Sequence, residues 1–85
     1  MDILQFEKMT PFELGETGQD EAIPFLIKYL RHGTSNEKKL AASGIKKLAK
    51  LKFDVVDALP DLINNTSNDS PQTRQYSLSA LQYIP

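Results

Sequence analysis

The chain has 85 residues, no cysteine and a formal net charge of −1 at pH 7. A chain of this length forms one small domain, and the lack of cysteine excludes disulfides and thiolate metal sites and fits a reducing cytoplasm. No apolar run approaches the roughly 18 residues of a membrane span, and the acidic N-terminus does not resemble a signal peptide. We therefore expect a soluble, cytoplasmic protein that does not enter a membrane.

Charge is strongly segregated along the chain. Residues 1–27 carry a net charge of −5, residues 28–52 carry +7, and residues 53–85 carry −3. This distribution argues against a protein whose whole surface is basic, and it directs attention to the central positive segment.

Residues 2–14 have apolar side chains at mixed helical spacings, and Thr10-Pro11 interrupts them as a helix cap followed by a first-turn proline would. This pattern predicts two short helical pieces. The turn that follows contains Gly18, which is free to take a positive φ, and Asp20, which is suited to cap the next helix.

Two longer helices are predicted next. The first has its apolar arc at Ala22, Ile23, Leu26, Ile27 and Leu30 and ends at Gly33. A capping-box pattern, Thr34-x-x-Glu37, then starts the second helix. Its apolar arc runs from Leu40 to Leu51, and Lys39, Ser43, Lys46 and Lys50 lie on the opposite arc.

An internal repeat organises the whole sequence. The stretch from Ala22 to Leu30 reappears 36 residues later as Ala58 to Thr66, and the same shift carries Thr34 onto the cap Ser70. A period in the thirties is typical of helical repeat proteins. We predict an all-α fold, an α-solenoid of antiparallel helix pairs. Its parts are an N-terminal capping half repeat (1–18), a first repeat (19–53) and a second repeat (54–85), either complete or as a fragment of a longer array.

The repeat makes a specific prediction about burial. We expect Leu26 and Leu62, and likewise Ile45 and Leu81, to occupy equivalent buried places, because each pair is related by the 36-residue shift.

Two stretches resemble HEAT repeats, including the short type found in phycobilin lyases. The run from Leu14 to Leu26 is similar to the junction between consecutive HEAT repeats, and Ser70 to Leu81 is similar to their second helix. The resemblance places Arg74 at the basic position of that helix, with Lys38 at its counterpart one repeat earlier. It implies that Arg74 pairs with Asp69 or Asp57. HEAT arrays serve several functions, so the resemblance implies a fold and not an activity.

The residues offer little for catalysis. His32 is the only histidine, so there is no credible zinc or haem ligand set, and we expect it to be a solvated residue near a helix end. Gly15-x-x-Gly18 lacks the lysine and the serine or threonine of a phosphate loop. We therefore expect a protein that is not an enzyme and that has no cofactor or metal.

The predicted function is binding through a concave helix face. In a helical solenoid the second helix of each repeat lines this face. The face would present Lys39, Ser43, Lys46, Lys50, Gln75, Ser79 and Gln82. Such a surface suits an acidic protein partner. Alternatives are nucleic-acid backbone binding, which the lack of groove aromatics disfavours, a regulatory or targeting appendage of a larger enzyme, and lysines that only keep the helix soluble.

The C-terminal end is the second candidate surface. The sequence provides no polar capping helix after the last helix, so we expect a partly exposed apolar edge formed by Tyr76, Leu78, Tyr83 and Ile84. Further repeats of a parent protein or a second copy of this chain would cover it.

Overall fold

The computed structural model describes residues 3–85, and these residues form helices and turns without a β-strand. The elements are α1 (Ile3–Phe6), α2 (Pro11–Glu16), η1 (Asp20–Ala22), α3 (Ile23–His32), α4 (Ser35–Lys50), η2 (Val56–Ala58), α5 (Leu59–Asn65) and α6 (Pro71–Leu81), η1 and η2 being 3₁₀ turns. The predicted all-α class is confirmed. Residues 1 and 2 of the predicted N-terminal half repeat lie outside the described residues.

The helix starts follow the predicted capping chemistry. Thr34 and Glu37 form a reciprocal capping box at α4, and Thr10 forms another with Glu13 at α2. Ser70 accepts a hydrogen bond from the amide of Thr73, and a proline follows it at the first position of α6. Serine and threonine hydroxyls at these positions satisfy amides that have no partner within the helix.

The prediction that Asp20 caps α3 is wrong. Asp20 lies inside the 3₁₀ turn η1, where its carbonyl accepts a hydrogen bond from the amide of Ile23. Ala22 precedes α3 and makes no side-chain cap. The turn itself pairs the backbone groups there, so no side-chain cap is needed. Gly18 has the predicted positive φ, at 65°.

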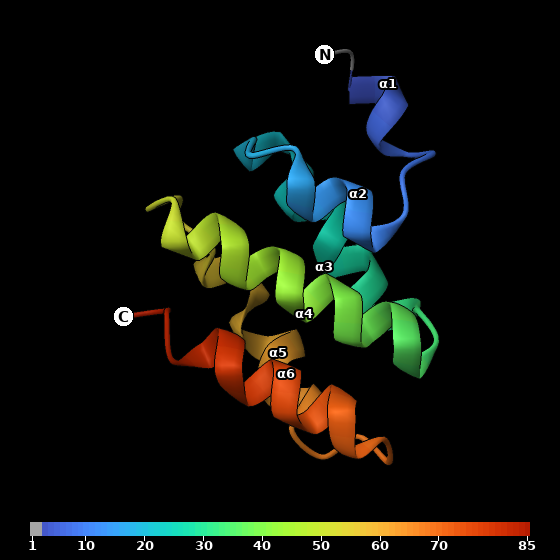
Figure 1. Ribbon diagram of the computed structural model, residues 1–85, viewed down its shortest axis with the longest axis vertical. Helices are drawn as coiled ribbons and strands as arrows, with labels where there is room; N and C mark the ends of the chain where they lie inside the picture. The colour runs from blue at the N-terminus through green and yellow to red at the C-terminus, as the bar shows by residue number, and fades with distance from the viewer. Residues whose placement is uncertain (1–2) are drawn as a thin grey trace.

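The helices form two layers (Figure 1). Helices α2, α4 and α6 lie side by side in the layer nearer the viewer, and α3 and α5 lie behind them. Helix α4 packs against α2, α3 and α6, and it is therefore the centre of the structure. Its residues Ile45 and Leu48 are fully buried, as is Leu26 of α3.

Element positions follow the 36-residue shift. The pairs η1 and η2, α3 and α5, and α4 and α6 each begin 36 residues apart. Leu26 and Leu62 are both fully buried, as predicted. The predicted equivalence of Ile45 and Leu81 is wrong, because Ile45 is fully buried and Leu81 is only partly buried. The reason is position: within the front layer α4 lies between α2 and α6, whereas α6 has only α4 beside it among the described residues.

Two glycines set the distance between α2 and α4. A Cβ added to Gly15 would lie 2.8 Å from the Cα of Gly44, which is closer than real Cβ contacts. The two backbones can approach this closely only because neither residue carries a side chain. The N-terminal segment is thereby fixed against one side of α4.

The resemblance misplaces the partners of Arg74. Its Nη1 donates to the backbone carbonyls of Asn68 at 2.8 Å and Asp69 at 3.2 Å, so it binds the turn before α6 through carbonyls and not through a carboxylate. Carbonyls beyond a helix end lack helical partners, and the guanidinium satisfies them. A bidentate ion pair instead joins Arg31 of α3 to Asp61 of α5. The hydrogen bonds and the negative charge of Asp61 raise the pKa of Arg31.

Candidate partner-binding groove

One side of α4 faces α6 along its length. The carbonyl of Ser35 accepts a hydrogen bond from the hydroxyl of Thr73 at 2.8 Å. Further along α4, Lys39 Nζ donates to Gln72 Oε1 at 3.3 Å, and Lys46 Nζ donates to Ser79 Oγ at 2.9 Å. These contacts come one or two helical turns apart, so the predicted lysine arc borders the contact with α6.

Two tyrosines lie beside these lysines: Tyr76 belongs to α6, and Tyr83 follows the end of α6. Lys39 Nζ lies 5.7 Å from the ring centroid of Tyr76, and Lys46 Nζ and Lys50 Nζ lie 5.2 and 5.1 Å from that of Tyr83. An ammonium within about 6 Å of an aromatic face is attracted by the ring quadrupole, by about 0.5–1 kcal/mol at exposed sites. The two rings therefore attract the three ammonium groups toward the junction of α4 and α6.

We call this surface the lysine–tyrosine groove. It is formed by Lys39, Ser43, Lys46, Lys50, Tyr76, Ser79 and Tyr83. A hollow of about 320 Å³ within it is lined by Ser43, Lys46, Gln75, Tyr76 and Ser79. The serine and tyrosine hydroxyls, the amide NH₂ of Gln75 and the ammonium of Lys46 can all donate hydrogen bonds to an anionic oxygen.

The groove uses only part of the basic segment. Lys47 is adjacent to Lys46 in the sequence, yet it lies toward α2, where it pairs with Glu16 and sits 4.9 Å from the ring of Phe12. Because α4 is flanked by two helices, its lysines are shared between them. Three ammonium groups of the groove lie beside tyrosine rings, whereas Lys47 joins α4 to α2.

The structure groups the predicted site residues differently from the two surfaces expected from the sequence. Tyr76 and Tyr83, expected at an apolar edge, have their rings beside the lysines of α4. Gln75 and Gln82, expected on the concave face, line a hollow of about 470 Å³ together with Leu78 and Ser79. Gln75 and Ser79 border both hollows.

The four residues of the predicted apolar edge are all partly exposed, with Tyr76 at 39% and Tyr83 at 44%. Leu78 is 53% exposed, whereas Ile84 is partly buried and packs against the core. The seven-residue spacing of Tyr76 and Tyr83 indicates that both lie on the same side as Ser79, Tyr76 in α6 and Tyr83 in the turn after it. The spacing does not reveal which side of α6 faces α4, so it could not place Tyr76 and Tyr83 in the groove.

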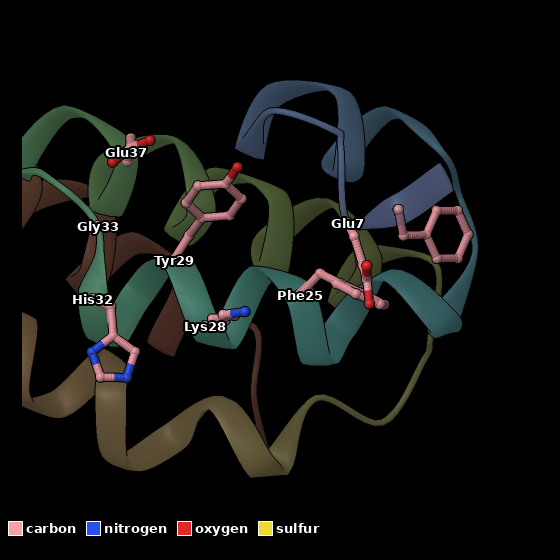
Figure 2. A pocket seen from close by; sticks show the side chains of 8 residues that line it. Glu7, Phe25, Lys28, Tyr29, His32, Gly33 and Glu37 are labelled. Atoms are coloured by element: carbon pink, nitrogen blue, oxygen red, sulfur yellow. The ribbon is translucent and has the colours of Figure 1, made fainter. Parts of the chain in front are cut away.

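A further hollow of about 460 Å³ lies between the N-terminal segment and α3 (Figure 2). Phe25, Lys28, Tyr29 and His32 reach it from α3, and Glu7 reaches it from the segment after α1. The hydroxyl of Tyr29 donates to the carbonyl of Met9 at 2.9 Å, which ties this segment to α3. His32 is exposed at the end of α3, as predicted.

Within residues 3–85, no group of three or more histidine, cysteine, aspartate or glutamate residues is arranged to hold a metal ion. No helix in this part of the chain has the length and apolar character needed to cross a bilayer. Comparisons with models of protein families, with curated proteins and with solved structures found no significant match to this chain.

Proposed function

We propose that this chain is a HEAT-like helical-repeat module that binds an acidic segment of a partner protein in the lysine–tyrosine groove, without catalysing a reaction. The observation that carries this proposal is the placement of Lys39, Lys46 and Lys50 within 5.7 Å of two tyrosine rings along one helix junction. The common start positions of the two helix pairs, 36 residues apart, support the repeat architecture.

The spacing of the lysines favours an extended acidic peptide. Along α4, Lys39 and Lys50 are separated by about 16 Å, at a rise of about 1.5 Å per residue. In an extended peptide, alternate side chains lie on one face about 6.6 Å apart. Alternating carboxylates therefore bring an acidic group within reach of each flexible lysine over a run of about six residues.

The two tyrosines can also contact a ligand directly. Tyr76 and Tyr83 are 39% and 44% exposed, so each ring still has area that a ligand can cover. Tyrosine is favoured at interfaces because it combines an apolar ring with a hydroxyl and has little side-chain entropy to lose. An acidic peptide with an apolar residue between its carboxylates would use both features.

A second candidate is single-stranded nucleic acid. From the sequence we expected no aromatic side chains in the groove, which disfavoured nucleic acid as a ligand. In the structure, however, Tyr76 and Tyr83 border the groove. Aromatic rings beside a row of cations are the general arrangement for stacking bases and binding phosphates. The acidic peptide remains favoured because the groove holds three lysines and no arginine, and the flanking segments 1–27 and 53–85 are net negative.

The test is a binding titration by fluorescence anisotropy. The probes are a labelled peptide of alternating glutamate and threonine, the same peptide with glutamine in place of glutamate, and a labelled single-stranded oligonucleotide. We expect binding of the glutamate peptide that weakens as salt rises, because exposed ion pairs are screened. Equal binding of the glutamine peptide contradicts the proposal, and preferential binding of the oligonucleotide selects the second candidate.

Charge reversal localises the binding. Lys46→Glu with Lys50→Glu removes both ammonium groups beside Tyr83. Each reversal replaces an attraction of up to about 1 kcal/mol by a repulsion, so we expect a loss of affinity of about tenfold or more. The control is Lys8→Glu with Lys28→Glu, two exposed lysines outside the groove with the same total charge change. Equal losses in the two variants would mean that only net charge matters.

A further inference from the structure

The hollow within the lysine–tyrosine groove is lined by side chains that can each donate a hydrogen bond. Ser43 and Lys46 reach it from α4, and Gln75, Tyr76 and Ser79 reach it from α6. Residues three or four apart on a helix lie on the same side, so each wall presents its donors together. The hollow measures about 320 Å³. It has room for a polyatomic anion, since a water molecule occupies only about 30 Å³ in the liquid.

Lys46 is held at this hollow by two contacts. Its Nζ donates a hydrogen bond of 2.9 Å to Oγ of Ser79 and lies 5.2 Å from the ring centroid of Tyr83. A lysine ammonium has three N–H donors, and a serine oxygen that accepts one hydrogen bond keeps its own hydrogen to donate. Lys46 and Ser79 can therefore both donate to the same anion while the bond between them stays in place.

The electrostatic surroundings of the hollow are positive. Lys39 Nζ lies 5.7 Å from the ring centroid of Tyr76, which is part of one wall. Residues 38–53 and 70–85, which include both walls, contain no aspartate or glutamate. The ammonium groups of Lys39 and Lys46 therefore attract an anion without an opposing carboxylate on either wall.

We propose that this hollow binds a phosphate monoester, carried on a phosphorylated serine or threonine of the acidic partner segment. The inference rests on the proposed peptide-binding function and names the group that the groove recognises. A phosphate monoester carries a charge of about −1.5 to −2 at pH 7 and offers three acceptor oxygens, whereas a carboxylate offers two. Donors on five side chains from two walls match the larger number of acceptors better. A phosphodiester of nucleic acid carries a single charge and suits the hollow less well.

Fluorescence anisotropy with three labelled peptides tests the inference. The first is the alternating glutamate and threonine peptide, and the second has phosphoserine in place of its central glutamate. The third keeps the central glutamate and has another glutamate in place of the next threonine, so its charge matches that of the phosphopeptide. We expect the phosphoserine peptide to bind at least about tenfold more tightly than the charge-matched peptide, because the phosphate accepts additional charge-assisted hydrogen bonds.

Ser43→Ala with Ser79→Ala tests whether the hollow is responsible. The two changes remove one hydroxyl donor from each wall, and alanine is the better helix former, so the fold should be kept. We expect the ratio of affinities for the phosphoserine and charge-matched peptides to fall below about threefold. The control is Ser67→Ala, an exposed serine in the turn after α5, which should leave the wild-type ratio. An unchanged ratio in the double variant, with its fold verified by circular dichroism, overturns the inference.

The outcomes separate this inference from the proposed function. If the phosphoserine and charge-matched peptides bind equally well, the inference is wrong and the proposal of acidic-peptide binding stands. If none of the three peptides binds at millimolar concentration, both are wrong. A single-stranded oligonucleotide that displaces the labelled phosphoserine peptide more strongly than the same unlabelled peptide does would assign the hollow to nucleic acid and also overturn the inference.

Discussion

The side-chain amide of Asn65 on α5 donates a hydrogen bond of 2.9 Å to the backbone carbonyl of Leu30 near the end of α3. Leu30 is among the last four residues whose carbonyls lack helical partners. Asn65 is only 1% exposed, so this bond lies inside the structure, where it joins the two helices of the rear layer.

Asn65→Ala should therefore destabilise the protein by about 1–3 kcal/mol, because the carbonyl of Leu30 stays buried without a partner. Urea unfolding followed by circular dichroism measures this difference. Asn64→Ala, at an exposed position of the same helix, is the control and should change stability by less than about 0.5 kcal/mol. Similar losses at both positions would show that the Asn65 bond contributes little.

Gly15→Ala tests the close approach of α2 and α4. Helix propensity alone predicts a gain of about 1 kcal/mol for this change in a helix. The added Cβ would lie 2.8 Å from the Cα of Gly44, however, and backbone atoms cannot move aside as the end of a side chain can. We expect a net loss of about 1–3 kcal/mol from overpacking. A stabilised variant in thermal melts would contradict the observed helix separation.

Leu26→Ala and Leu62→Ala test the repeat. Both leucines are fully buried at the same position of α3 and α5. Each truncation should cost about 2–5 kcal/mol, a large part of the stability of a small domain. Ile63→Ala is the control, because Ile63 is 57% exposed. Loss at only one of the two leucines, in equilibrium unfolding, would mean that the two helix pairs are not energetically equivalent.

Tyr83→Leu separates the two ligand classes considered for the groove. The change keeps apolar area but removes the aromatic face beside Lys46 and Lys50. If bases stack there, affinity for single-stranded nucleic acid should fall by about 1–3 kcal/mol. Affinity for the acidic peptide should fall by less than that, because the ammonium groups remain. The two probes are compared by anisotropy at one salt concentration, and a larger loss for the peptide would contradict this role of the ring.

Local signals in the sequence predicted the helix starts well. Thr34 and Glu37, and Ser70 with Pro71, fix the beginnings of α4 and α6 through bonds within four residues. Such contacts depend on the adjacent chain alone, and for that reason they can be read from spacing.

The composition of the groove could not be predicted in the same way. Lys46 and Lys47 are neighbours in the sequence, yet one lies beside Tyr83 on the side of α6 and the other beside Phe12 on the side of α2. Which flank of α4 meets which helix depends on how the layers pack. The surroundings of Tyr76 and Tyr83 depend on the same packing, so the sequence predicted an apolar edge for rings that lie beside the lysines of α4.

Binding of an acidic peptide between α4 and α6 should be visible in amide chemical shifts during a titration with the alternating glutamate and threonine peptide. We predict that the largest shift changes fall on residues 39–50 and 72–83 and saturate together with a single affinity. Changes centred instead on Lys28 and His32 at the hollow beside α3, or no changes at millimolar peptide, would contradict binding in the groove.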